Sequence, residues 1–189
     1  MKIIVGISGS TGVIYGIRLL QVLKQHSGVK TLLVMSKPAK QTILIETDFT
    51  IEQVEALADK VYRIGDIAGA ISSGSFKTDA MVVVPCSVKT LSAIANSYDD
   101  NLLVRAADVT LKEKRRLILV VRETPLHLGH LRLMTSVVEM GAVLMPPVPA
   151  FYSKPKTLDD IVNQTVGRIL DLLGIEEDRL FQRWLGVNE

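Results

Sequence analysis

The sequence predicts an α/β fold in a single domain, with a doubly wound, Rossmann-like or flavodoxin-like parallel sheet of about six strands and helices on both faces. Short runs rich in Val, Ile and Leu do not alternate between apolar and polar residues as half-exposed strands do. Such continuous apolar runs are typical of strands buried on both faces. Amphipathic stretches with helical spacing separate these runs. The length of 189 residues suffices for one hydrophobic core and is too short for two domains of ordinary size. We therefore expect one domain over residues 1–189, with 174–189 as a C-terminal tail or short helix.

Several runs are predicted to be strands because each is short, apolar and bounded by Gly, Pro, Ser or charged residues. A further run, Val61 to Ile64, gives a weaker signal of the same kind. The stronger runs are Lys2 to Ile7, Thr31 to Met35, Ala80 to Val84, Leu117 to Val121 and Ala142 to Met145.

Capping patterns mark the starts of the helices between the strands. Thr50 is followed three residues later by Gln53, and Thr157 is followed at the same spacing by Asp160, a weaker version of the same box. The last helix has apolar residues at helical spacing up to Leu173, and Arg168 falls on the flank of that face.

Composition excludes several classes of function. The 22 basic and 20 acidic residues are spread along the chain and give a net charge of +2, so we expect no nucleic-acid surface. The single cysteine excludes an internal disulfide, and the N-terminus enters a strand pattern at once instead of a signal segment, which together favour a cytoplasmic protein. No apolar run reaches the ~18 residues of a membrane span.

A glycine-rich turn, Gly6 to Gly12, follows the first predicted strand. Ligands of doubly wound sheets bind beyond the carboxyl ends of the strands, which is where this turn lies. Its backbone N–H groups, the start of the next helix and the hydroxyls of Ser8, Ser10 and Thr11 suit a phosphate or a flavin. The spacing matches neither the dinucleotide fingerprint nor a Walker loop, and a tight turn without a ligand is the alternative.

Two further strand ends are rich in hydroxyl groups. Ser36 ends the second strand and is placed to cap the next helix, and Pro85 to Thr90 opens another helix in the same way. Helix starts at neighbouring strands can close on one nucleotide from two sides, so the glycine-rich turn and the turn from Pro85 to Thr90 together indicate a nucleotide site. For Ser36, capping alone is the alternative and is slightly favoured.

Charged residues at another strand end suggest a second anion site. Arg122 and Glu123 follow the strand that ends at Val121, and Lys112, Tyr152 and Arg168 add donors suited to a phosphate distinct from that of the nucleotide. Unrelated surface ion pairs are the alternative. Glu46 is another candidate site carboxylate, for which simple surface exposure is equally compatible with the sequence.

Other reactive residues give weaker signals. Cys86 follows a strand at a helix start, where a thiol can become nucleophilic, but no positioned His accompanies it and a small buried residue is favoured. His127 and His130 lack a third ligand at matching spacing, so we expect no metal site.

Sequence blocks along nearly the whole chain, in the same order, closely resemble the UbiX flavin prenyltransferase family. No single block is decisive, but the collinear set is specific. The blocks are Gly9-Ser10-Thr11-Gly12, Ser36-Lys37, Ser72 to Phe76, Pro85 to Thr90, Arg105 to Glu113, Val121 to Leu126 and Pro149 to Tyr152.

The resemblance implies a metal-independent enzyme of one flavoprotein domain. It would join the dimethylallyl group of dimethylallyl monophosphate to N5 and C6 of reduced FMN, bound as a substrate and released as prenylated FMN. A separate UbiD-type decarboxylase would receive this product in ubiquinone synthesis or phenolic acid metabolism. The resemblance also implies a dodecamer with sites at subunit interfaces.

The resemblance further implies roles for individual residues. The FMN contacts fall on Gly9, Ser10, Thr11, Ser36, Ser87, Val88, Lys89, Thr90 and Arg122. The dimethylallyl phosphate contacts fall on Lys112, Arg122, Tyr152 and Arg168, with Trp184 as an aromatic wall of the prenyl site. The catalytic residues fall on Thr11, Glu46 and Glu123.

One departure from the family pattern concerns Gly9-Ser10-Thr11, where many members of the ubiquinone branch have Gly-Ala-Ser. Thr11 keeps the hydroxyl, which the resemblance implies relays a proton at flavin N5. Two other functions stay open: an FMN-dependent decarboxylase of peptide cysteines or aromatic acids, and a non-catalytic FMN carrier. The cysteine decarboxylases have Pro-Ala-Ser-Ala-Asn-Thr where this chain has Lys89 in its turn, and a carrier would not need Lys112, Tyr152 and Arg168.

Overall fold

A computed structural model describes residues 1–186 of the chain. It contains two compact units, Met1–Pro146 and Pro147–Glu189.

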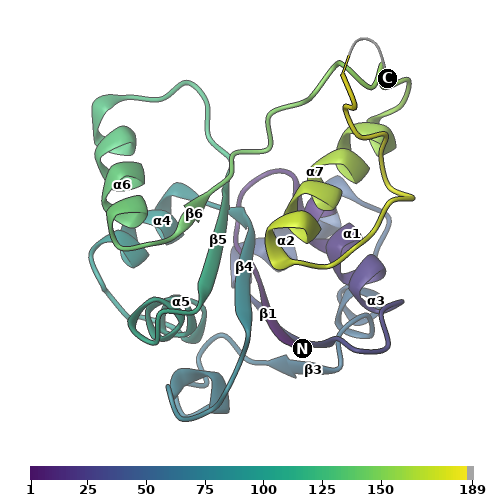
Figure 1. Ribbon diagram of the computed structural model, residues 1–189. Coiled ribbons are helices and arrows are strands. Elements are labelled where there is room, and N and C mark those ends of the chain that lie inside the picture. Colours follow the sequence, from purple (N-terminus) through teal and green to yellow (C-terminus); the bar gives the residue numbers. More distant parts are fainter. Residues whose placement is uncertain (187–189) are drawn as a thin grey trace. The chain divides into compact units, whose positions relative to one another are not determined.

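The first unit is built on a six-stranded sheet in the order β3-β2-β1-β4-β5-β6, with all pairs parallel (Figure 1). This is the strand order of the Rossmann fold, so the predicted class is confirmed. The strands are β1 (Lys2–Ile7), β2 (Lys30–Met35), β3 (Lys60–Tyr62), β4 (Ala80–Cys86), β5 (Arg116–Val121) and β6 (Val143–Leu144).

Helices cover both faces of this sheet, as predicted. Alternate side chains of the strands, such as Ile4 and Met81, form one buried cluster with α4, α5 and α6 on one face, and α1 packs on the other (Figure 1). The helices of this unit are α1 (Val13–Leu23), α2 (Lys37–Glu46), α3 (Ile51–Glu55), the 3-10 helix η1 (Ala70–Ser72), α4 (Val88–Ala95), α5 (Leu102–Lys112) and α6 (Leu128–Glu139).

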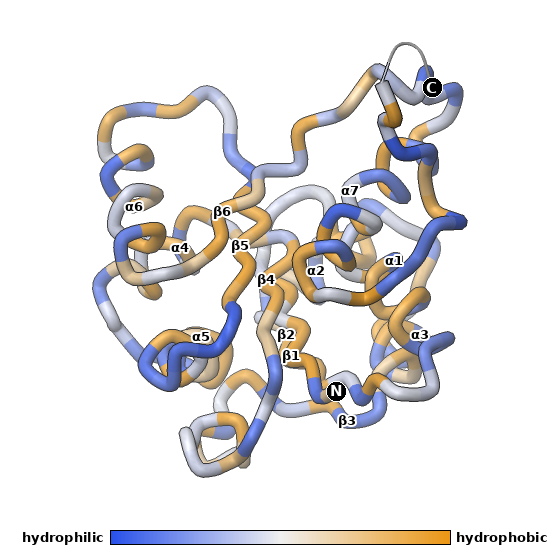
Figure 2. Tube along the Cα trace, viewed as in Figure 1, coloured by the Kyte–Doolittle hydropathy of each residue, from blue (hydrophilic) through white to orange (hydrophobic). Residues whose placement is uncertain are grey.

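The strands are apolar along their length because both faces are covered. Figure 2 shows the central strands as nearly continuous hydrophobic segments, and every residue of β4 is buried. The six predicted strands are therefore all found. Their observed ends differ by up to two residues from the predicted ends, because the ends of secondary-structure elements are defined only to within one or two residues.

Helix caps fix the boundaries that the sequence predicted. Thr50 and Gln53 form a reciprocal capping box at α3, and Thr157 and Asp160 form another at α7 (Leu158–Leu173). Ser36 accepts a hydrogen bond from the N–H of Ala39 and so caps α2.

The second unit contains α7 (Leu158–Leu173), which ends at Gly174 in the left-handed conformation, φ 72°. Residues 174–186 form no helix or strand and return along α7, where a Cβ on Gly167 would overlap the ring of Phe181. The expected C-terminal segment is thus an irregular tail as far as residue 186. Across residues 1–186, no helix is long and apolar enough to cross a membrane.

Gly16 lies in the middle of α1 at its closest approach to the sheet. A Cβ there would overlap the carbonyl oxygen of Val84 and lie 3.0 Å from Cδ1 of Ile7. Helix propensity alone favours alanine by about 1 kcal/mol, but a backbone carbonyl in the sheet cannot move aside.

We predict that Gly16→Ala lowers the free energy of unfolding by about 1–3 kcal/mol, the usual range for overpacking. The measurement is urea denaturation at fixed protein concentration. Gly28→Ala is the control, because a Cβ at Gly28 would meet no atom within 4 Å. A Gly16→Ala variant as stable as the wild type would show that α1 can move away from the sheet.

Candidate functional site

A pocket of about 490 Å³ lies at the carboxyl edge of the sheet in the first unit. This volume lies within the usual range for small-molecule sites. The chain changes direction here, because β1 has β2 on one side and β4 on the other, which is the point where doubly wound sheets bind ligands. The lining residues are Gly9, Ser36, Lys37, Pro38, Ile64, Ser87, Val88, Lys89, Thr90, Asn101, Leu103 and Glu123.

The glycine-rich turn packs closely against the start of α2. A Cβ on Gly9 would overlap Cβ of Pro38, so only glycine permits this approach. Gly12 adopts φ 92°, a conformation that glycine tolerates without strain, and begins α1. The backbone of the turn therefore reaches the pocket without a side chain in the way.

Ser8 has a structural role in place of the predicted donor role. It is fully buried, its hydroxyl donates to the carbonyl oxygen of Pro85 at 2.9 Å, and it accepts from the N–H of Ser87 at 2.7 Å. The interpretation of Ser8 as a ligand donor is wrong, because its hydroxyl proton is donated to Pro85 in β4 and its oxygen accepts from Ser87, directly after β4.

Two helices begin at the pocket. Ser36 caps α2, and Ser87 caps α4 by accepting from the N–H of Thr90 at 3.3 Å. The hydroxyl of Ser87 also lies 3.2 Å from Oγ1 of Thr90. Helix N-termini carry unsatisfied N–H groups and a partial positive charge, so this arrangement favours an anionic group.

Lys89 places a cation at the pocket and is itself paired. Its Nζ lies 2.7 Å from Oδ2 of Asp100, and Asp100 also accepts from the side-chain amide of Asn101 at 2.6 Å. The pair lies on the surface, where its contribution to stability is small. The main effect of Asp100 is therefore to orient the side chain of Lys89, with little contribution to the free energy of unfolding.

Sequence reasoning did not assign five of the pocket residues to the site, and three of them, Ile64, Asn101 and Leu103, come from segments whose position depends on the order of the strands. The N–H of Leu102 donates to the carbonyl oxygen of Ile64 at 2.9 Å, which joins the segment after β3 to the start of α5. Lys37 and Pro38 directly follow Ser36, so the cap at Ser36 was the signal for those two. The missed residues are Lys37, Pro38, Ile64, Asn101 and Leu103.

The end of β5 contributes Glu123 to the pocket, where Oε1 accepts from the N–H of Thr124 at 2.9 Å. Arg122 is exposed, and its carbonyl oxygen accepts from the hydroxyl of Ser10 at 3.0 Å. Its N–H donates to the carbonyl oxygen of Cys86 at 3.2 Å. The glycine-rich turn, the end of β4 and the end of β5 are therefore joined by hydrogen bonds.

Glu46 ends α2 and reaches the glycine-rich turn, where Oε2 accepts from the N–H of Gly12 at 2.8 Å. Thr11, the preceding residue, is exposed. The structure therefore brings two of the predicted catalytic residues, Thr11 and Glu46, to one turn beside the pocket, although neither lines it.

Lys112 lies at the opposite edge of the sheet from the pocket. It ends α5, and β5 then runs from Arg116 to Val121 before reaching Arg122. Six strand residues span about 20 Å at ~3.3 Å per residue. The expected cluster of Lys112 with Arg122 therefore does not form within one chain.

The remaining predicted residues belong to the second unit. The rings of Tyr152 and Trp184 meet edge to face with centroids 5.9 Å apart. Arg168 donates to Asp171 at 2.8 Å, and Arg183 donates to the other oxygen of that carboxylate at 2.8 Å. Hydrogen bonding from Arg183, followed by the charges of both arginines, lowers the pKa of Asp171.

Cys86 and the two histidines have no arrangement suited to chemistry. Cys86 is fully buried, and burial raises the pKa of its thiol, so the thiol stays protonated. The ring centroids of His127 and His130 lie 3.6 Å apart with the rings tilted by 30°, and His127 caps α6. Within residues 1–186, no group of three metal-ligating side chains occurs.

The chain matches known proteins over nearly its whole length. Residues 1–170 match the family model described as Flavoprotein. The chain is 61% identical over 187 residues to the flavin prenyltransferase UbiX of Escherichia coli K12, covering 98% of this chain and 99% of that protein. It is 58% identical to the Thauera aromatica UbiX, covering 100% of this chain and 96% of that protein. It is 53% identical to the mitochondrial PAD1 flavin prenyltransferase of Saccharomyces cerevisiae, covering 98% of this chain and 76% of that protein.

Solved structures agree with these relatives. A dodecameric FMN-dependent UbiX-like decarboxylase from Escherichia coli O157:H7 has a TM-score of 0.96 and 51% identity, covering 98% of this chain and 100% of that chain. AnUbiX (PadA1), in complex with FMN and dimethylallyl pyrophosphate, has the same TM-score and identity, covering 99% of this chain and 98% of that chain. The peptidyl-cysteine decarboxylase EpiD, at 17% identity and a TM-score of 0.64, shares the fold. With these relatives and the pocket described above, the chain belongs to the UbiX flavin prenyltransferase family.

Proposed function

We propose that this protein is a flavin prenyltransferase that joins the dimethylallyl group of dimethylallyl monophosphate to N5 and C6 of reduced FMN. The observation that carries the proposal is the pocket between two helix N-termini, capped by Ser36 and Ser87, in a chain of this family. FMN provides the nucleophilic ring atoms, and the protein provides binding, charge and proton transfer.

The residues of the pocket fit FMN. The two helix N-termini and the hydroxyls of Ser36, Ser87 and Thr90 suit its phosphate and ribityl groups, and the open backbone at Gly9 suits close approach of a ring. Apolar groups of Val88 and Leu103 complete the walls. Ser10, Thr11 and Arg122 adjoin these residues through the hydrogen bond from Ser10 to Arg122.

We assign the second phosphate to Arg122, Tyr152, Arg168 and Lys112. Breaking the bond between the allylic carbon and oxygen leaves negative charge on the phosphate, which guanidinium, ammonium and phenol donors stabilise. The dimethylallyl group departs as an electron-poor fragment. The indole of Trp184, held against Tyr152, offers it a π face.

Proton transfer is assigned to carboxylate and hydroxyl groups near the pocket. Glu123 accepts the proton lost from C6 when the new ring closes, and Thr11 relays a proton at N5. Glu46 orients this turn through its hydrogen bond to the N–H of Gly12.

The position of Lys112 supports an oligomer. Because the sheet separates Lys112 from the pocket of its own chain, its ammonium can bind the prenyl phosphate only in the pocket of a second copy. We therefore propose a dodecamer, the assembly of the related E. coli O157:H7 structure, in which a second copy would supply this contact.

We further propose that a UbiD-type decarboxylase receives the product, in ubiquinone synthesis or phenolic acid metabolism, and that the reaction takes place in the cytoplasm. A direct FMN-dependent decarboxylase and a non-catalytic FMN carrier are the competing functions. Lys89 at the start of α4 and the pair Arg122 and Glu123 favour the transferase over a cysteine decarboxylase.

We predict that anaerobic incubation with reduced FMN and dimethylallyl monophosphate yields a flavin heavier by one isoprene unit, measured by mass spectrometry of the released flavin. Dimethylallyl pyrophosphate in a parallel reaction tests the choice of phosphate. Recovery of unmodified FMN from folded, FMN-binding protein would contradict the transferase function and favour a non-catalytic FMN carrier.

Glu123→Gln is expected to lower kcat roughly 100-fold, a typical loss for a general acid or base, while FMN affinity stays the same. Stopped-flow absorbance and FMN titration measure the two quantities. Glu139→Gln is the control, since Glu139 is an exposed carboxylate on α6 outside the pocket. Unchanged turnover in Glu123→Gln would end its proton-transfer role.

Mixing chains tests whether Lys112 acts in a second copy. Lys112→Ala and Glu123→Gln should each keep only a small but measurable activity alone. After joint refolding in equal amounts, about a quarter of the sites pair an intact pocket with an intact Lys112 if subunits mix at random, so activity should return to about a quarter of the wild type. No recovery in verified mixed oligomers would contradict the contribution from a second copy.

A further inference from the structure

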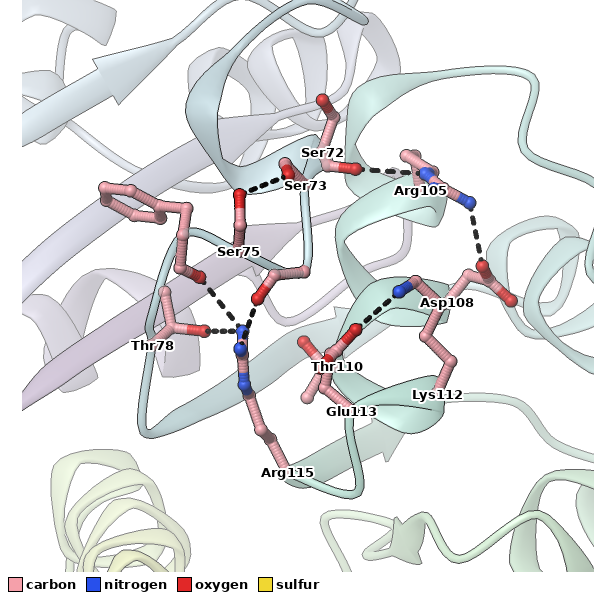
Figure 3. Close-up of polar contacts among 12 residues, drawn as sticks. Ser72, Ser73, Ser75, Thr78, Arg105, Asp108, Thr110, Lys112, Glu113 and Arg115 are labelled. Carbon is pink, nitrogen blue, oxygen red and sulfur yellow. Dashed lines mark hydrogen bonds and ion pairs between the residues drawn. The ribbon is translucent and has the colours of Figure 1, made fainter.

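Lys112 rests on a loop that the reaction assigned above does not use. The loop runs from Ser72 to Phe76 and joins η1 to the segment before β4. Figure 3 shows it beside the end of α5, with Lys112, Glu113 and Arg115 facing it. The ring of Phe76 lies 5.0 Å from Nζ of Lys2 at the start of β1, so the loop belongs to the amino edge of the sheet.

Two arginines fix this loop at both ends. Arg105 donates from Nε to the carbonyl oxygen of Ser72 at 3.2 Å and is itself held by Asp99 and Asp108. Arg115 donates to the carbonyl oxygen of Gly74 at 2.6 Å and to that of Phe76 at 3.0 Å (Figure 3). Guanidinium groups with several fixed donors hold a backbone in one conformation, so the loop forms a rigid base.

Glu113 holds the ammonium of Lys112 above this base. Oε1 of Glu113 lies 2.5 Å from Nζ of Lys112, and both side chains are partly exposed. Hydrogen bonding and charge from Lys112 lower the pKa of Glu113, so the Glu113 carboxylate is ionised at neutral pH. An exposed ion pair of adjacent residues adds little to the free energy of unfolding. Its main effect is therefore to orient the side chain of Lys112.

Gly74 lies where the loop from Ser72 to Phe76 meets the side chains of Lys112 and Glu113. A Cβ on Gly74 would overlap Oε1 of Glu113 and lie 2.9 Å from Nζ of Lys112. Its backbone does not adopt the left-handed conformation, so alanine is permitted by the backbone. The atoms that would have to move are the ends of two flexible side chains, so the substitution displaces the ammonium at little cost to the fold.

We infer that Gly74 and Glu113 are positioning residues that set where the ammonium of Lys112 stands when it meets the prenyl phosphate of a second copy. This inference rests on the proposed function. It adds a second set of residues, at the edge of the sheet opposite the pocket, that determines affinity for the phosphate substrate without touching it.

The test is Gly74→Ala, with Gly28→Ala as the matched control. Gly74→Ala should lower kcat/KM for dimethylallyl monophosphate roughly three- to tenfold, as expected for a weakened charge-assisted hydrogen bond. FMN affinity, the melting temperature and the oligomeric state should match the wild type, and Gly28→Ala should match it in every measurement.

A double-mutant cycle separates positioning from a general structural effect. In a Lys112→Ala background, Gly74→Ala should cause no further loss, because its effect acts through the ammonium. Glu113→Gln should show a smaller loss of the same direction that also disappears in that background. Additive losses, or wild-type kcat/KM in Gly74→Ala, would overturn the inference. An inactive wild type would instead contradict the proposed function.

Discussion

The site depends on one buried hydroxyl, that of Ser8, which both donates to the carbonyl of Pro85 and accepts from the N–H of Ser87. These two bonds tie the end of β1 to the turn that opens α4. A second tie, from the hydroxyl of Ser10 to the carbonyl of Arg122, adds the end of β5. Because buried polar groups must be paired, the register of these turns is fixed by hydrogen bonds that a ligand does not have to form. The pocket is therefore preorganised by the protein itself.

The rigid backbone that forms the pocket and the long charged side chains assigned to phosphate come from different parts of the chain. Rigid turns, helix N-termini and the close contact at Gly9 shape the pocket. The charged groups assigned to phosphate lie on long side chains that are at least partly exposed, such as Arg168 and Lys112, each paired with a carboxylate. Such pairs contribute little to the free energy of unfolding, so under the proposed function they would exchange a carboxylate for a phosphate at low cost. Specificity for the prenyl phosphate would then depend on where the charged ends of these side chains lie.

Much of the fold followed from the sequence, because parallel strands buried on both faces leave continuous apolar runs and because Thr50, Thr157 and Ser36 have recognisable capping patterns. The turns that form the pocket were also predictable, since they lie at strand ends. The role of Ser8 was not, because burial of one hydroxyl among three depends on tertiary packing. Ile64 and Leu103 required the strand order, and the distance of Lys112 from the pocket required the strand direction.

The position of Lys112 at the amino edge of the sheet limits which substitutions evolution can tolerate on that surface. A monomeric enzyme with this fold keeps its functional residues at the carboxyl edge of the sheet, and the amino edge is free to vary. Here, under the proposed function, the loop from Ser72 to Phe76 is an outer surface in one chain and part of the reaction environment in the next. Substitutions there are constrained by chemistry as well as by folding, and each change is copied at once into every site of the assembly.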